Sequence, residues 1–195
     1  MSFFREFLRN PLAVGAVAPS GRTLAEVITA AIPGHGDPVV VELGPGTGAF
    51  TAAIQARLAG RGRHIALEIN RGFADRLAAE HPAVEVVVAD AGRLRAELAA
   101  RGLHSADVVV SGLPWAAFEA HRQDDVLTAV ATVLPAHGAF TTFAYVHARQ
   151  LPPARRLLRQ LRSRFEEVVI GRTVWANLPP ALVYHCRRAA PIRGA

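Results

Sequence analysis

The chain has 195 residues, of which 51% are hydrophobic and 19% are charged. This length and composition are typical of one globular domain, and they exclude an intrinsically disordered protein. The net charge is +6 and all 22 basic residues are arginines, so we expect an anionic partner such as phosphate, nucleic acid or an acidic membrane. The single cysteine, Cys186, excludes an intrachain disulfide and fits a reducing cytosol.

Two helical elements are expected before the first strand. The stretch "SFFREFLRN" places Phe3, Phe4 and Phe7 on one face of a helix, and its charged residues break the pattern of a secretory signal. The stretch "GRTLAEVITAAI" predicts a second helix with Ser20 as its N-cap. We therefore expect a single domain over residues 1–195, in which residues 1–35 form a helical lid or membrane-facing segment and residues 36–188 form the core.

From residue 38 onward, strand-like and helix-like segments alternate. The early strands are continuous apolar runs, which is how strands buried on both faces read. Alternation with helices predicts an α/β fold with a parallel, doubly wound, Rossmann-like sheet. The expected strands are "PVVVELG", "RHIALEI", "VEVVVAD", "ADVVVSG" and "GAFTTFAYV", followed by a closing hairpin of "EEVVIGRTVW" and "ALVYHCRR".

A glycine-rich turn, "ELGPGTG", joins the first strand to the helix after it. Glycines at such a turn let the backbone bend sharply and let a ligand approach closely. Glu68 ends the second strand, where an acid can accept both hydroxyls of a ribose, and Asp90 ends the third strand, where it can meet an adenine amino group. Together these positions predict a nucleoside pocket, against the alternative that both acids only cap the helices that follow.

The spacing of the loop favours S-adenosylmethionine over a dinucleotide. Glu42 stands two residues before the first glycine, where its carboxylate would repel a pyrophosphate but suits the cationic methionine end of the methyl donor. Over residues 38–188 the chain resembles the class I methyltransferase family, which implies seven strands with the last antiparallel. It also implies that the donor, and its product S-adenosylhomocysteine, contact Glu42, Gly44, Pro45, Gly46, Thr47, Gly48, Glu68, Ile69, Asp90, Ala91, Ser111 and Gly112.

The fourth strand ends in "SGLPW". In class I enzymes that methylate amino groups, an Asn-Leu-Pro-aromatic or similar motif at this position holds the target nitrogen. Here Ser111 and Gly112 replace the asparagine, while Pro114 and Trp115 remain. Trp115 is expected either to offer its ring face to an ammonium or a base, or to be a core or lid aromatic.

The stretches "FLRNPLAVGAVAPSGRTLA" and "RTVWANLPPALVYHCRR" extend the resemblance to the bacterial phospholipid N-methyltransferases. That resemblance implies methylation of the amino head group of phosphatidylethanolamine. It also implies that the segment ending at Ser20 lies over the donor and that the N-terminal helix docks on membrane. The related ribosomal RNA adenine dimethyltransferases share the glycine loop, but they carry an asparagine in the fourth motif and an added helical domain, both missing here, so nucleic acid is not the expected partner.

Further expectations concern the acceptor and the membrane. Tyr145 and His147, just past the fifth strand, are candidates to act on the amine proton. His147 is expected either to act as a base near neutral pH or to be an exposed turn residue. Residues 3–9 and the basic helix at 155–164 are candidate peripheral contacts with the inner face of the plasma membrane of a cytoplasmic protein. The leucines of that basic helix pack on the sheet in the alternative reading. The histidines show no metal-ligand spacing, and no metal is expected.

Three alternatives to a phospholipid substrate stay open at this point. A small-molecule N-, O- or C-methyltransferase would use the same fold, with the apolar N-terminal helix as a lid. Methylation of RNA is supported mainly by the arginine excess. A module that binds the donor without transferring a methyl group would keep Glu42, Glu68 and Asp90.

Overall fold

A computed structural model describes residues 21–190 of the chain. The expected alternation of strands and helices is present throughout this range. The elements are α2 (Arg22–Ile28), β1 (Val39–Leu43), α3 (Thr51–Leu58), β2 (Arg63–Glu68), α4 (Arg71–Glu80), β3 (Glu85–Val88), η2 (Ala91–Arg93), α5 (Leu94–Ala99), β4 (Val108–Ser111), η3 (Trp115–Ala117), α6 (Ala120–Val133), β5 (Ala139–Tyr145), η4 (Val146–Ala148), α7 (Pro152–Arg164), β6 (Phe165–Ile170) and β7 (Ala181–Ala189).

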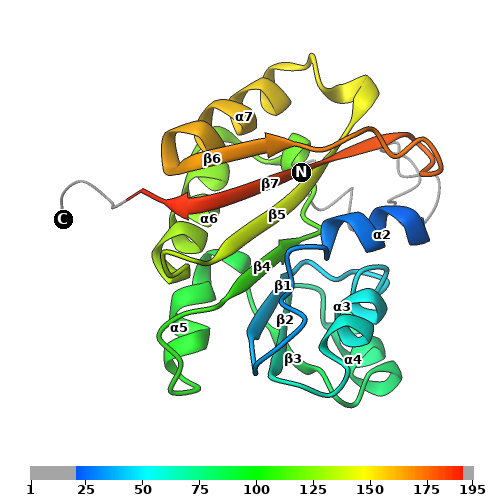
Figure 1. Ribbon diagram of the computed structural model, residues 1–195, viewed down its shortest axis with the longest axis vertical. Coiled ribbons are helices and arrows are strands. Elements are labelled where there is room, and N and C mark those ends of the chain that lie inside the picture. The colour runs from blue at the N-terminus through cyan, green and yellow to red at the C-terminus, as the bar shows by residue number, and fades with distance from the viewer. Residues whose placement is uncertain (1–20, 191–195) are drawn as a thin grey trace.

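The strands form one seven-stranded sheet in the order β3-β2-β1-β4-β5-β7-β6. Strands β1 to β5 pair in parallel, whereas β7 is antiparallel to both of its neighbours, β5 and β6. The order reverses between β1 and β4, which is the topological switch point where ligands of such sheets bind. The predicted seven-stranded, mostly parallel α/β fold with an antiparallel last strand is confirmed (Figure 1).

Helices cover both faces of the sheet, giving three layers. One face packs against α5, α6 and α7 through residues such as Leu94, Leu127 and Leu157. The other face packs against α2 and α3 through residues such as Ile28 and Ile54, with α4 at its edge. Successive residues of a strand point to opposite faces, so β1 sends Val41 and Leu43 to the first layer of helices, while Glu42 faces the second.

Two local predictions differ from the structure. The helical spacing of "GRLRAELAARG", residues 92–102, predicts one helix, but this segment begins as the short helix η2 and continues as α5. At the start of η2, the Asp90 carboxylate accepts a hydrogen bond from the Gly92 backbone N–H at 2.8 Å. The predicted second helix begins at Arg22 with Gly21 as its N-cap and no side-chain cap. Ser20, predicted as that cap, and Phe3, Phe4 and Phe7 lie outside the described residues.

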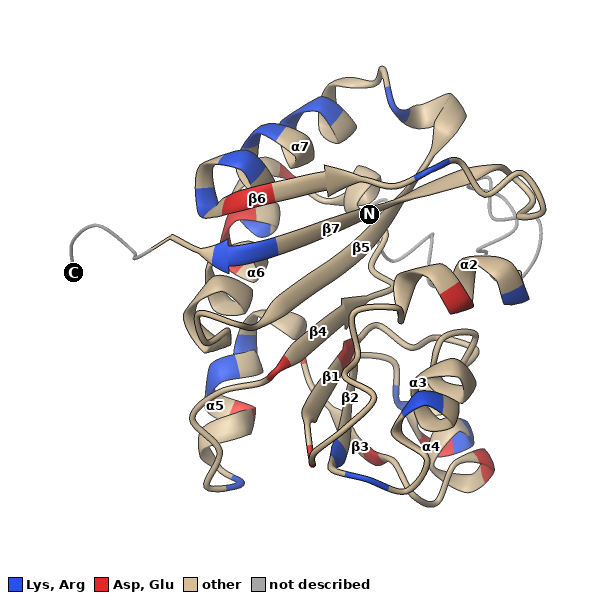
Figure 2. Cartoon of the chain, in the orientation of Figure 1, with Lys and Arg blue, Asp and Glu red and all other residues tan. Residues whose placement is uncertain are grey.

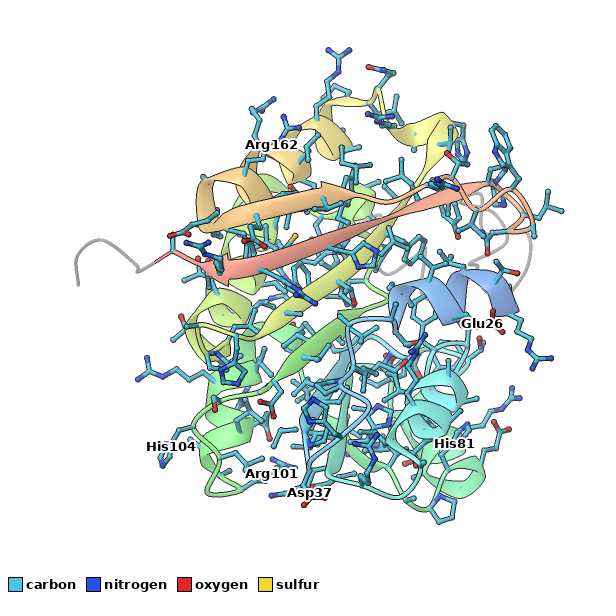
Figure 3. The ribbon with its side chains drawn as sticks, viewed as in Figure 1. Glu26, Asp37, His81, Arg101, His104 and Arg162 are labelled. Atoms are coloured by element: carbon cyan, nitrogen blue, oxygen red, sulfur yellow. The ribbon has the colours of Figure 1, made fainter. Side chains whose placement is uncertain are left out.

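The basic helix is α7, and its leucines follow the packing alternative. Leu157 and Leu161 belong to the core, and the exposed arginines line the other side of the helix (Figure 2). Arg162 lies on that outward side (Figure 3). No helix among residues 21–190 is long and apolar enough to cross a membrane.

Candidate functional site

The glycine loop after β1 contains three residues in the left-handed region, with φ of +67° at Gly44, +55° at Gly46 and +80° at Gly48. An L side chain would be strained at each of these positions. A Cβ on Gly44 would lie 2.7 Å from Cδ2 of Leu113, so this glycine lets the loop after β4 pack against the loop after β1. A Cβ on Gly46 would meet no atom of residues 21–190 within 4 Å. The backbone at Gly46 therefore borders open space into which a ligand can approach.

Glu42, at the end of β1, is fully buried beneath this loop. Its Oε2 accepts a hydrogen bond of 2.8 Å from the Thr51 hydroxyl, at the start of α3. Nε2 of His64 on β2 lies 3.2 Å from the same oxygen but without hydrogen-bond geometry. Gln55 holds the other ring nitrogen of His64 at 2.9 Å. Within the described part of the chain, Glu42 Oε1 is buried without a hydrogen-bond partner, which is the state of an acceptor that a cationic or N–H-bearing ligand would satisfy.

Glu68 ends β2 and reaches back to the glycine loop. Its Oε2 accepts from the Gly46 backbone N–H at 3.1 Å, and its Oε1 accepts from the Asn70 backbone N–H at 2.8 Å. Burial raises the pKa of Glu68 and outweighs these backbone hydrogen bonds, which lower it. Ile69, the next residue, leaves 44% of its surface exposed at the same end of the sheet. The Glu68 carboxylate could accept hydrogen bonds from the hydroxyls of a ribose, and the apolar Ile69 could pack against the base attached to it.

Asp90, after β3, is engaged in two ways. Besides capping η2, its carboxylate forms an ion pair with Arg122 at the start of α6. The Arg122 guanidinium also lies 5.8 Å from the centre of the Phe118 ring. A ligand that hydrogen-bonds to Asp90 must therefore share this carboxylate with Arg122 or displace the arginine. Ala91 is buried in the core beside Leu94, so only its backbone is suited to a ligand contact.

The "SGLPW" turn lies directly beside the glycine loop. A Cβ on Gly112 would lie 2.7 Å from the Gly44 carbonyl oxygen, so glycine is needed for this close approach. Ser111 is buried, and its carbonyl accepts a hydrogen bond of 3.2 Å from the Thr142 hydroxyl on β5. The turn is thus held between β1 and β5, at the switch point of the sheet.

Trp115 lies in the core, which favours the alternative of a core aromatic over a ring offered to the substrate. It is 3% exposed, and its Nε1 donates to the Thr142 hydroxyl at 2.7 Å. Phe118 and Phe140 pack edge to face with it at 5.7 and 6.3 Å between ring centres. Its indole N–H finds a partner on β5 because Ser111 and Thr142 are opposite each other in the β4–β5 register. Trp115 therefore supports the turn from behind.

Tyr145 and His147 lie together at the end of β5. Their rings stack at 5.7 Å with 15° between the planes, and His147 is exposed. Burial raises the pKa of Tyr145, so its phenol stays protonated near neutral pH. Phe143 packs against Tyr145 at 5.4 Å and against Phe50, after the glycine loop, at 5.8 Å. These four residues form an aromatic row, Phe50–Phe143–Tyr145–His147, which runs from the glycine loop to the end of β5.

The structure thus brings most of the predicted residues to the carboxyl edge of the sheet. Around the glycine loop are the buried Pro45 and the exposed Thr47. The partners of the acids were missed: Thr51 and His64 for Glu42, and Arg122 for Asp90. No motif in the sequence marks these partners, because strand register and helix packing create the contacts. Within residues 21–190, no group of three or more His, Cys, Asp or Glu side chains is arranged to hold a metal ion.

The open glycine loop and the buried Glu42 fit the methionine part of S-adenosylmethionine. Glu68, next to the exposed Ile69, fits the ribose, and Asp90, which caps η2, fits the adenine. The fold and the site define a class I methyltransferase. Comparisons with known proteins agree. A family profile described as a methyltransferase domain matches residues 40–138. The chain is also 35% identical, over 191 residues, to an ornithine lipid N-methyltransferase of Singulisphaera acidiphila, covering 95% of this chain and 94% of the relative.

Solved structures show the same fold at lower identity. An O-methyltransferase of Thermotoga maritima superposes with a TM-score of 0.64 at 14% identity, over 87% of this chain and 66% of that chain. Human methyltransferase-like protein 13, solved in complex with S-adenosylhomocysteine, superposes with a TM-score of 0.62 at 17% identity, over 88% of this chain and 82% of that chain. The chain belongs to the methyltransferase domain family, and it is an enzyme that uses S-adenosylmethionine as its methyl donor.

Proposed function

We propose that the chain transfers methyl groups to the primary amine of a membrane-lipid head group. The observation that carries this proposal is the 35% identity, over 95% of the chain, with a relative named as an ornithine lipid N-methyltransferase. The resemblance of the sequence to phospholipid N-methyltransferases points to the same class of acceptor. Phosphatidylethanolamine and an ornithine lipid both present a primary amine and an anionic group on a lipid anchor.

The aromatic row supports an ammonium acceptor. Phe50 is buried at the inner end of this row, while the half-buried Phe143 and Tyr145 and the exposed His147 continue it to the acceptor side of the switch point. Ring faces attract cations, and more strongly where water is excluded. An ammonium drawn to this row would lie next to the "SGLPW" turn, which closes on the glycine loop at Gly44.

The bound donor supplies an electrophilic methyl group on sulfur together with its own leaving group. The protein therefore mainly positions the acceptor for an in-line approach. The amine must lose a proton before its nitrogen attacks, and its pKa in water is near that of lysine, about 10.4. We assign Tyr145, a neutral phenol, to hydrogen-bond and orient the nitrogen. We assign the exposed His147, stacked on Tyr145, to pass the proton to solvent.

A radiolabel experiment tests the lipid substrate. Labelled S-adenosylmethionine is incubated with the protein and vesicles that contain phosphatidylethanolamine or an ornithine lipid, with free ethanolamine, free ornithine and total RNA in parallel. We expect label in the methylated lipids and little in the soluble amines. Label in RNA or in soluble amines alone, from protein shown by calorimetry to bind the donor, would contradict the proposal.

Two variants separate the assigned roles. Tyr145→Phe removes the hydroxyl but keeps the ring, and we expect kcat to fall by about 10²-fold, the cost of a misplaced reacting group. His147→Gln keeps a polar side chain that cannot carry the proton, and we expect kcat to fall. Unchanged kcat in both variants would remove Tyr145 and His147 from the mechanism.

A further inference from the structure

Large apolar side chains are exposed mainly at one edge of the molecule. Of the six that are exposed among residues 21–190, five belong to segments at the carboxyl ends of the parallel strands: Ile69, Val88, Leu151, Trp175 and Leu178. The sixth, Val169, lies within the edge strand β6. Ile69 and Val88 border the donor half of the site. The other three are 51%, 75% and 66% exposed and stand on the acceptor half.

Leu151, Trp175 and Leu178, called here the apolar rim, come from two loops that share this edge. One loop leaves β5 and leads into α7, and the other joins β6 to β7. Tyr145 at the end of β5 pairs with Ala181 at the start of β7, and the Val146 backbone N–H donates to the Pro180 carbonyl at 2.9 Å. Figure 1 shows both loops at the end of the sheet where α2 lies.

The β6–β7 loop is held in this shape by a buried side chain. Asn177 accepts a hydrogen bond of 2.8 Å from the Gly21 N–H, at the start of α2, and donates one of 2.6 Å to the Pro179 carbonyl. Asn177 is buried while Trp175 and Leu178 on either side of it face outward. The outward position of these two apolar side chains is thus fixed by the fold.

The positive charge around the apolar rim favours contact with an anionic surface. Arg149 and Arg172 are exposed on the same two loops, and residues 146–153 and 171–180 contain no acidic side chain. In Figure 2 the connection between β6 and β7 carries blue but no red. Tryptophan and leucine flanked by arginine are the residues that insert at the boundary between lipid head groups and acyl chains.

We propose that the apolar rim is the face with which the protein contacts an anionic lipid bilayer. The proposed function supplies only the use of this face: a head-group amine would reach Tyr145 without leaving the membrane interface. It assigns the contact to Leu151, Trp175 and Leu178, with Arg149 and Arg172 attracting the anionic head groups, in addition to any contact made by residues 3–9 or by α7.

The chain carries a built-in probe for this test, since one of its two tryptophans is buried and the other exposed. Vesicles of phosphatidylcholine and phosphatidylglycerol with brominated acyl chains are mixed with the protein, and tryptophan emission is recorded. We expect a blue shift and quenching in the wild-type protein, and neither in Trp175→Phe, whose remaining Trp115 lies in the core. Vesicle binding without quenching of Trp175 would overturn the proposal and place the contact elsewhere.

Partitioning in vesicle flotation gives a second measure. The double variant Trp175→Ser with Leu178→Ser should bind anionic vesicles about tenfold more weakly, because two exposed apolar side chains no longer enter the interface. Val169→Ser is the matched control, since it removes an exposed apolar side chain away from the rim, and its binding should not change. If the double variant binds vesicles as well as the wild-type protein, the apolar rim is not the membrane contact. The same conclusion follows if the double variant loses self-association or a protein contact but still binds vesicles. Quenching requires neither donor nor methyl transfer, so failure of the lipid-substrate assay does not affect this result.

Discussion

Replacement of Gly46 by alanine tests whether the open space at the glycine loop is the place of the methyl donor. The backbone φ of +55° makes an L residue unfavourable there by about 1–2 kcal/mol. Because a Cβ would touch no atom of the described part of the chain within 4 Å, no further loss of stability is expected from packing there. The same Cβ would occupy the space that the methionine part of the donor approaches. Overfilling of this kind costs about 1–3 kcal/mol, which corresponds to about a 5- to 150-fold rise in Kd.

Gly102→Ala is the matched control for this variant. Gly102 has a φ of +69° and equally open surroundings, but it lies between α5 and β4, at the opposite edge of the sheet. Urea unfolding should show a similar loss of stability in both variants. Calorimetric titration with S-adenosylhomocysteine should show weaker binding only in Gly46→Ala. Equal affinities in the two variants would refute the placement of the donor against this loop.

Three further variants test groups that are buried or half-buried. Trp115→Phe should lower the free energy of unfolding by about 1–3 kcal/mol, because it leaves a small cavity and loses the hydrogen bond to Thr142. Its KM should stay unchanged. A large change in KM without loss of stability would show that Trp115 contacts the substrate. Burial lowers the pKa of His185 from its ordinary 6.5. The unfolded chain therefore binds a proton at this histidine more readily than the folded chain does. The contribution of His185 to stability is present above pH 6.5 and is lost as the pH falls. The urea midpoint of His185→Asn should therefore depend less on pH below 6.5 than that of the wild type, and parallel curves would contradict this. Asn177→Ala should cost about 1–3 kcal/mol and speed proteolysis near Gly21, because it releases the N–H of that residue; unchanged cleavage would show that this hydrogen bond does not hold the two segments together.

Several features of the fold are predictable from local patterns. Apolar runs such as "PVVVELG" and the helical spacing between them give the element order, because burial on both faces of a strand and on one face of a helix leaves different periods in the sequence. Glycine at three alternate positions after β1 marks backbone that other residues adopt only with strain. Glu68 ends one strand and Asp90 follows the next, so their placement at one edge follows once the strands are parallel.

The sequence by itself therefore determined the class of fold, and it predicted the glycine loop and the edge of the sheet that form the candidate site. Only the tertiary structure decided which groups meet there. Trp115 packs against Phe140, and its indole N–H reaches Thr142, because strand order and register bring β4 and β5 together. Arg122 reaches Asp90 from 32 residues away, and Asn177 reaches Gly21 from 156 residues away. Local periodicity records whether a residue is buried on average, but a partner distant in sequence is fixed only by strand order, register and helix packing, which leave no pattern at either residue alone.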